Sequence, residues 1–378
     1  MIELLLFLLL PLASLSGWLI GRRALSLQTV RQFLGLNKVL NSNPNKAVDV
    51  ISELIDSDQD VVDTHLALGG AFRRSGEVDK AVGIHQNLIN KSSLTQEQRS
   101  VSLLELSQDY MRAGMLDRAE SILLDLIEQG HQLNAGYQLL LDIYQQSKDW
   151  TRAIQISQEW EEKTKKKKSH TIAHFYCELA EQQWLKGEKE DARRHLKSAL
   201  KANTNCVRAN LLSGNMEAQS GHFQEAIRAY QEVHKQDPNF VSEIILPMAR
   251  CYESLGDTEG MVTYFEECSK NRMTTATVLA FSEWLFESRG EQEAVDFITQ
   301  HLRRYPSLRG LSRLIQFSID QSESSTRQDL LLFKGLIEKM LTKKPLYQCE
   351  ACGFSSRVLQ WQCPGCKRWD MIKPIHEQ

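Results

Sequence analysis

Apolar and polar positions divide the chain into three stretches. Residues 4–20 form a run without charge, LLLFLLLPLASLSGWLI. From there to about residue 341, apolar residues recur with the spacing of amphipathic helices, and few proline or glycine residues interrupt them. The last stretch, residues 342–378, carries two Cys-x-x-Cys pairs. We therefore expect an all-α protein made of an N-terminal membrane helix, a helical body and a small C-terminal metal module.

The first stretch predicts a transmembrane anchor over residues 1–21. Its seventeen uncharged residues would rise about 25 Å as a helix, close to the lower limit for a membrane span. A cleaved signal peptide is the alternative, but such a peptide begins with positive charge, and the early charged side chain here is Glu3. Between Arg22 and Val48 there are five Lys or Arg residues and no acidic residue. The positive-inside rule then places Met1 outside and the body in the cytoplasm.

Three small residues near the end of this span, Ala13, Gly17 and Gly21, are spaced by four. Such a stripe allows close packing against another membrane helix, which makes a homo-oligomer possible. The alternative is that small residues simply occur near the end of the span.

The middle stretch repeats one pattern, in which a small residue follows a turn and precedes an aromatic or aliphatic residue. The gaps between successive small residues are 34, 38, 34, 39, 34, 35 and 33. A period near 34 is the length of a tetratricopeptide repeat, a helix pair that buries its apolar stripe only by stacking on its neighbours. Residues 22–341 are therefore predicted to form an α-solenoid of about eight repeats, closed by a capping helix pair at 308–341. The marking residues are Ala47, Ala81, Ala119, Ala153, Ala192, Ala226, Met261 and Ala294.

Repeats of this kind bind peptides or proteins in a concave groove lined by the first helix of each pair. Solvated helix surface is the alternative for any single residue in this set. By the repeat register, the residues expected to face a partner are Arg73, Arg74, Gln108, Arg112, His174 and Glu181.

Two further patterns in the body have weaker functional interpretations. Lys163 and Lys165–Lys168 form a charge run, which indicates a solvated loop or, alternatively, a contact with an anionic partner or lipid headgroup. His170 and His174 lie four residues apart, with Cys177 beyond them, a helical spacing that allows metal ligation. Without an acidic ligand on the same helix, packing or a groove role is favoured. We find no phosphate-binding loop and no nucleophile elbow, so no enzyme is predicted.

The C-terminal pairs, Cys349 with Cys352 and Cys363 with Cys366, predict a single metal ion bound by four thiolates, zinc or iron. A module of about thirty residues cannot bury enough apolar surface to fold alone, so the metal should supply much of its folding free energy. Structural thiols or a redox Cys-x-x-Cys are the alternative. The other four cysteines are scattered through helical stretches and indicate buried reduced thiols, in keeping with a reducing compartment.

These pairs resemble the knuckles of rubredoxin, but two features depart from that family. Lys367 replaces the second knuckle glycine, and the spacer of ten residues between the pairs is shorter. From Lys343 to Gln378 there are six Lys or Arg residues against three acidic ones. These features favour docking on an acidic protein or nucleic-acid surface over electron transfer. We also expect the module to pack in an ordered way against the end of the array, because the linker Thr342–Leu346 is short.

With 378 residues the chain has room for two or three domains, and its net charge of −3 and apolar content of 42% are ordinary for a soluble body. The whole chain resembles the lipopolysaccharide assembly protein B family of Gram-negative bacteria. The resemblance rests on MIELLLFLLLPLASLSGWLIGRR at one end and CEACGF…WQCPGCKRWDMIKPI at the other, with LGGAFRRSGEVDKAVGIHQ and IAHFYCELA between them.

This resemblance implies a single-pass protein of the bacterial inner membrane, with a periplasmic N-terminus and a cytoplasmic body, that regulates lipopolysaccharide synthesis. It implies an adaptor that helps the membrane protease FtsH degrade the lipid A deacetylase LpxC, under the restraint of an inner-membrane sensor. Other envelope-synthesis proteins and the membrane are further implied partners, and no nucleic acid is expected. The alternatives are a general scaffold that gathers envelope-synthesis enzymes without directing degradation, and a redox protein that uses the four-cysteine site.

Overall fold

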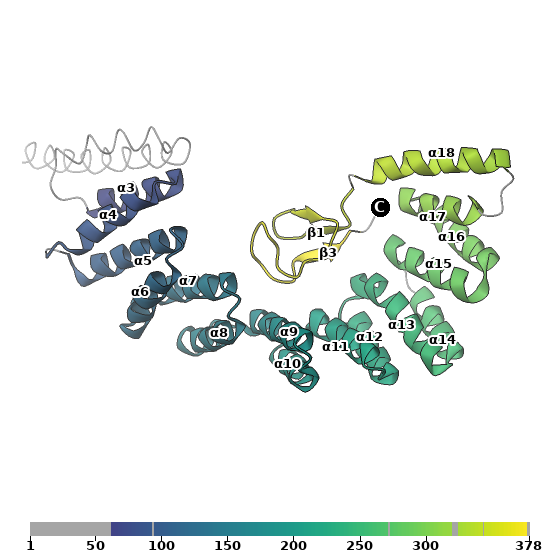
Figure 1. The fold of residues 1–378 in the computed structure, drawn as a ribbon, viewed down its shortest axis with the longest axis horizontal. Coiled ribbons are helices and arrows are strands. Elements are labelled where there is room, and N and C mark those ends of the chain that lie inside the picture. Colours follow the sequence, from purple (N-terminus) through teal and green to yellow (C-terminus); the bar gives the residue numbers. More distant parts are fainter. Residues whose placement is uncertain (1–61, 93, 271–272, 320–323, 343, 376–378) are drawn as a thin grey trace, which may run out of the picture. The chain divides into compact units, whose positions relative to one another are not determined.

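The structure, a computed structural model, describes residues 62–375 apart from 93, 271–272, 320–323 and 343. Stacked helix pairs make up most of this part of the chain, and a small sheet follows them. The chain divides into two units, Met1–Asp149 and Trp150–Gln378, each with its own internal contacts (Figure 1). The predicted anchor, the small-residue stripe and the first repeat, marked by Ala47, lie outside the described residues. Within the described ranges, no helix is both long and apolar enough to cross a bilayer.

In the first unit, short turns with glycine in the left-handed region join the helices of a pair. Gly76 has a φ of 89° and Gly114 a φ of 76°, which an L side chain adopts only with strain. Each turn reverses the chain, so that α3 packs on α4 and α5 packs on α6, while α3, α5 and α7 lie next to one another. The helices are α3 (Val62–Ser75), α4 (Val78–Ile89), α5 (Gln96–Arg112), α6 (Leu116–Glu128) and α7 (Leu133–Gln146).

The second unit continues the pattern and ends in the metal module. Its core is apolar from α11 to α17, with Tyr230, Phe240 and Phe281 fully buried. Its helices are α8 (Trp150–Thr164), α9 (Ser169–Leu185), α10 (Lys189–Ala202), α11 (Val207–Gln219), α12 (Phe223–Gln236), the short 3-10 helix η1 (Pro238–Phe240), α13 (Val241–Leu255), α14 (Thr258–Ser269), α15 (Thr275–Arg289), α16 (Glu291–Arg304), α17 (Leu308–Ile319) and α18 (Ser324–Leu341).

The small residues that marked the repeat lie at the tightest helix contacts of both units. Each described alanine in the series, from Ala81 to Ala294, has no exposed surface, and Met261 is 1% exposed. Glycine on the facing helix allows the closest approach: a Cβ added at Gly69 would lie 2.3 Å from the His85 ring, and one added at Gly214 would lie 2.3 Å from the Tyr230 ring. The predicted tetratricopeptide pattern is therefore confirmed for these pairs.

The last pair, α17 and α18, differs from the expected cap in its surface. A terminal cap of a solenoid usually presents a polar outer face. On α18, however, Leu332 is 62% exposed, Phe333 57% and Met340 60%. Among the described residues no helix covers them, and these side chains form an apolar face on α18.

The metal module is a three-stranded sheet with two turns that carry the cysteines. Its strands are β1 (Tyr347–Cys349), β2 (Ser355–Ser356) and β3 (Ile372–Pro374), in the order β2-β1-β3. Both neighbours run antiparallel to β1, with Gln348 opposite Ser355 on one side and Lys373 on the other. β3 also contacts η1, so the sheet is joined to the middle of the helical array (Figure 1).

Candidate metal centre and binding groove

The two Cys-x-x-Cys turns point four sulfur atoms at one position. In the first turn, the Gly353 N–H donates to the Cys349 carbonyl, and in the second the Lys367 N–H donates to the Cys363 carbonyl. The Sγ atoms of Cys349 and Cys366 are 3.7 Å apart, and those of Cys352 and Cys363 are 3.6 Å apart. Tetrahedral zinc with Zn–S bonds of about 2.3 Å requires sulfur atoms about 3.8 Å apart. The four predicted ligands therefore fit one tetrahedral ion.

The second turn favours a thiolate at Cys363. Burial would raise the pKa of Cys363, but the backbone N–H groups of Cys366 and Gly365 face its sulfur, and the pKa falls to about 7. Lys367, which stands where rubredoxin has glycine, has a φ of 59°. The left-handed turn is therefore kept with a lysine, at a cost in backbone strain of about 1–2 kcal/mol.

Trp369 of the module packs into the inner face of the array. Its ring stacks on His174 of α9, with centroids 5.1 Å apart and planes at 22°. It meets Phe175 and Trp150 edge-on at 5.7 and 6.3 Å. With 7% of its surface exposed, Trp369 anchors the module on α8 and α9.

A buried arginine of α11 lies beside both tryptophans of the module. The Arg208 guanidinium is 5.8 Å from the Trp369 ring and 6.0 Å from the Trp361 ring. It also donates to the carboxylates of Glu178 and Glu181 on α9. Because the side chain is 4% exposed, its charge is compensated by these two acids and by the aromatic faces.

Further contacts of the module reach η1 and α13. Trp361 stacks on Phe240 at 5.5 Å, and the Tyr347 hydroxyl donates to Glu243 at 2.8 Å. Lys373 pairs with Asp237 at 3.1 Å. The interface is ordered, as the short linker predicted. At the end of the array, the Arg309 side chain of α17 donates to the Pro345 carbonyl at 2.8 Å. The aromatic contacts lie elsewhere than expected, on α8, α9 and η1, because aromatic burial there outweighs proximity in sequence.

The predicted groove residues of the second unit, His174 and Glu181, take part in this interface. His174 is 1% exposed beneath Trp369, and Glu181 binds Arg208. The inner face at α9 and α11 is thus covered by the chain's own module. Trp361, Trp369 and Arg208 were not predicted as part of this interface. The available signal in the sequence was a pair of tryptophans in a module too small to bury them.

In the first unit, the predicted groove residues lie together. Arg73, Arg74, Gln108 and Arg112 line one open pocket of about 490 Å³ with Met111 and Leu139. All of them come from α3, α5 and α7, the first helices of successive pairs.

The four charged and polar residues of this pocket differ in their pairing. Arg73 is held by Glu105 at 2.6 Å and by Asp109 at 2.7 Å, and Asp109 also contacts His85 at 2.5 Å. Arg74 and Arg112 are exposed, and neither makes an ion pair among residues 62–375 that the structure describes. They leave two uncompensated positive charges above an apolar floor.

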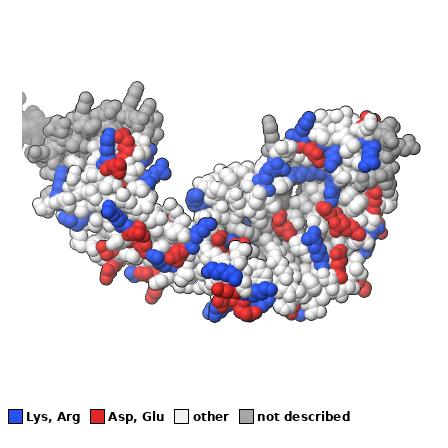
Figure 2. Space-filling view, viewed as in Figure 1, with Lys and Arg blue, Asp and Glu red and all other residues white. Residues whose placement is uncertain are grey.

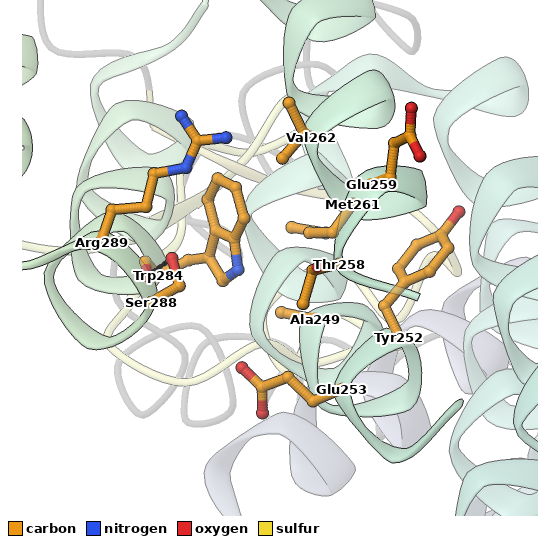
Figure 3. Close-up of a pocket in the computed structure, with 10 residues that line it drawn as sticks. All are labelled: Ala249, Tyr252, Glu253, Thr258, Glu259, Met261, Val262, Trp284, Ser288 and Arg289. Atoms are coloured by element: carbon orange, nitrogen blue, oxygen red, sulfur yellow. Dashed lines mark hydrogen bonds between the residues drawn. The ribbon is translucent and has the colours of Figure 1, made fainter. Parts of the chain in front are cut away.

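A second pocket, of about 450 Å³, lies between α13, α14 and α15 (Figure 3). Its buried floor includes Met261 and Trp284. The carboxylates of Glu253 and Glu259 point away from each other at opposite ends, and the Arg289 side chain lies over Trp284 at 5.9 Å. The two acids are therefore not arranged as an acid–base pair.

Charges of both signs are spread over the visible face of each unit (Figure 2). The chain as a whole has a net charge of −3. Recognition of a charged partner must therefore depend on local groups such as Arg74 and Arg112 rather than on a long-range field.

Comparisons with known proteins match both parts of this architecture. The rubredoxin metal binding domain family matches residues 347–374, and tetratricopeptide repeat families match residues 64–99 and 178–239. Lipopolysaccharide assembly protein B of Escherichia coli K12 is 34% identical over 386 residues, covering 99% of this chain and 98% of that protein. Its counterpart in Haemophilus influenzae is 31% identical over 396 residues, covering 100% of this chain and 99% of that protein. A solved tetratricopeptide protein fragment of Cytophaga hutchinsonii is 13% identical, covering 70% of this chain and 98% of that chain, with a TM-score of 0.40.

Proposed function

The chain belongs to the lipopolysaccharide assembly protein B family, and on that basis we propose that it is a non-enzymatic adaptor of the bacterial inner membrane. In this proposal, residues 1–21 anchor it with its N-terminus in the periplasm, and the tetratricopeptide body lies in the cytoplasm. The adaptor brings the lipid A deacetylase LpxC to the membrane protease FtsH and so limits lipopolysaccharide synthesis. Tethering raises the effective concentration of the partners, so modest contacts suffice.

The observation that carries the proposal is the open pocket of the first unit. Arg74 and Arg112 occupy equivalent positions of two successive repeats and lie at one pocket with Met111 and Leu139. Such a surface suits an extended client segment with acidic and aliphatic residues, because each arginine can bind a carboxylate bidentately. The inner face of α9 and α11 is occupied by the module, which leaves the first unit as the client groove.

The metal module has a structural role in this proposal. One zinc or iron ion bound by Cys349, Cys352, Cys363 and Cys366 would hold the two turns together. The module would then keep its tryptophans in place against the array. A redox role requires an iron chromophore that is reversibly reduced in protein made at native levels.

The test is the cellular half-life of LpxC. We expect loss of the protein to lengthen this half-life, and an Arg74→Gln/Arg112→Gln double variant to lengthen it as well. The matched control is Arg99→Gln/Arg118→Gln, which removes two exposed arginines from α5 and α6 outside the pocket. An unchanged half-life in cells lacking the protein would reject the adaptor and favour a general scaffold for envelope-synthesis enzymes.

A further inference from the structure

A second cluster of metal-binding side chains lies where the module meets α9. His170 and His174 are one helical turn apart and share a face of that helix. Asp370 of the module approaches the same face, with its Oδ2 atom 3.4 Å from His170 Nε2. One ligand atom from each of the three residues lies within 4.8 Å of the others. The missing acidic ligand of the His-x-x-x-His pattern therefore comes from a segment 200 residues away.

His174 has a nitrogen atom without a partner in this cluster. Its side chain is 1% exposed, and Nδ1 is buried without a hydrogen bond. An unsatisfied buried polar atom costs about 1–3 kcal/mol, so such an atom calls for a partner.

Asp370 is held in an orientation that suits a ligand. Its φ of 58° lies in the left-handed region, which aspartate tolerates better than most residues. Lys373 binds its Oδ1 atom at 3.3 Å, while Oδ2 faces His170. A ligating carboxylate whose other oxygen is fixed by a neighbouring group is the usual arrangement around protein metal sites.

The charged side chains around the cluster carry a net negative charge, which favours a divalent cation. Two cations, Arg208 and Lys373, lie close to it. The carboxylates paired with them are Glu178, Glu181, Asp237 and Asp370. Four carboxylates against two cations leave an excess of two negative charges. A divalent ion bound by His170, His174 and Asp370 would offset that excess.

We propose that His170, His174 and Asp370 form a second metal site that takes a divalent transition ion such as Zn²⁺ and joins the module to the array. Two imidazoles and one carboxylate are a common zinc ligand set, with water in the fourth position. With metal–ligand bonds of about 2.1 Å, ligand atoms lie about 3.4 Å apart. The His170–Asp370 distance of 3.4 Å already matches this value, and the wider separations shorten on binding.

The site is tested by metal stoichiometry on the full-length chain after any affinity tag has been removed. In a chelator-buffered Zn²⁺ solution, we expect one equivalent more than the cysteine site takes. His170→Gln and Asp370→Asn should each lose this additional equivalent and keep the first. His195→Gln on α10 is the matched control, because that histidine stacks on Tyr176 away from the cluster, and it should bind as the wild-type chain does.

Cobalt separates the two sites by spectroscopy. Co²⁺ bound by four thiolates shows thiolate-to-metal charge transfer, whereas Co²⁺ at the second site should show only weak ligand-field bands. The proposal is overturned if the wild-type chain binds no ion beyond the cysteine site, which would make the His170–Asp370 contact a simple ion pair. It is also overturned if both variants, with helicity and cysteine-site metal retained, still bind the additional equivalent.

Discussion

At the scale of single residues, the helix pairs depend on the absence of a side chain at a few contacts. Gly69 of α3 faces the fully buried His85 of α4, whose ring fills the place of a Cβ. His85 in turn contacts Asp109 of α5, and Asp109 holds Arg73. One glycine thus allows a buried network that joins three helices. That network places Arg73 at the open pocket of the first unit.

Replacing this glycine should therefore damage the first unit. A Gly69→Ala side chain would overlap the His85 ring at 2.3 Å, and overpacking of this kind costs about 1–3 kcal/mol. Gly83→Ala on α4 is the matched control, since a Cβ there meets no atom within 4 Å. Alanine in a helix interior gains about 0.5–1 kcal/mol over glycine, and both variants share this gain.

Chemical denaturation of the two variants measures the difference. We expect Gly83→Ala to be as stable as the parent chain or more stable. Gly69→Ala should have a free energy of unfolding about 1–3 kcal/mol lower than that of Gly83→Ala, because its side chain overlaps the His85 ring. Equal stability of both variants would contradict the packing described here.

At the scale of elements, the metal module is held by aromatic side chains rather than by its linker. Trp369 contacts α8 and α9, and Trp361 contacts η1. Arg208 of α11 lies beside both rings. Three neighbouring parts of the array are therefore joined through a module that follows all of them in the sequence.

Removal of the Trp369 side chain should free the module from α9. Trp369→Ala would leave an apolar cavity beside His174 and Phe175, and loss of a buried tryptophan costs about 3–5 kcal/mol. We expect faster amide hydrogen exchange in α9 and faster proteolysis of the linker Thr342–Leu346. Val358→Ala, at a position 67% exposed, should leave both unchanged. Wild-type exchange in Trp369→Ala would mean that the ring contributes little to docking.

Features that depend on residues close together in the sequence could be predicted, whereas contacts between distant segments could not. The alanine and glycine positions were predictable because each helix pair is a local unit with a fixed period. The four cysteines were predictable because two short turns determine the ligand spacing. The docking of Trp369 on His174 could not be predicted. It joins positions 195 residues apart, and no repeating pattern in the sequence indicates that the two residues meet.

At the scale of the whole molecule, the two units use their inner faces differently. In the first unit, Arg74 and Arg112 line an open pocket. In the second, the face at α9 and α11 is covered by the module, while apolar side chains of α18 such as Phe333 stay exposed. The covered face depends on the metal, because the module has few buried residues of its own besides Cys349, Cys363 and Ile372.

Replacement of one metal-binding cysteine should therefore expose the face at α9 and α11 without unfolding the array. We expect Cys349→Ser or Cys366→Ser to lose the metal and the order of the module, because the ion supplies most of its folding free energy. Far-ultraviolet circular dichroism should keep its helical signal, and metal analysis should show the loss. Cys251→Ser, a buried cysteine outside the site, is the control and should retain the metal. A variant with wild-type metal content would contradict the assignment of the ligands.

The contact between positions 170 and 370 also sets an order of events during synthesis. The ribosome has made α8, α9 and α11 long before Trp361 and Trp369 leave the exit tunnel. Until then, Trp150, Phe240 and their neighbours remain without the rings that cover them in the finished chain. A chain that is truncated, or that is released where the metal is scarce, would display this apolar surface to chaperones and proteases. Completion of the second unit thus reports that the module has been synthesised and that the metal has been bound.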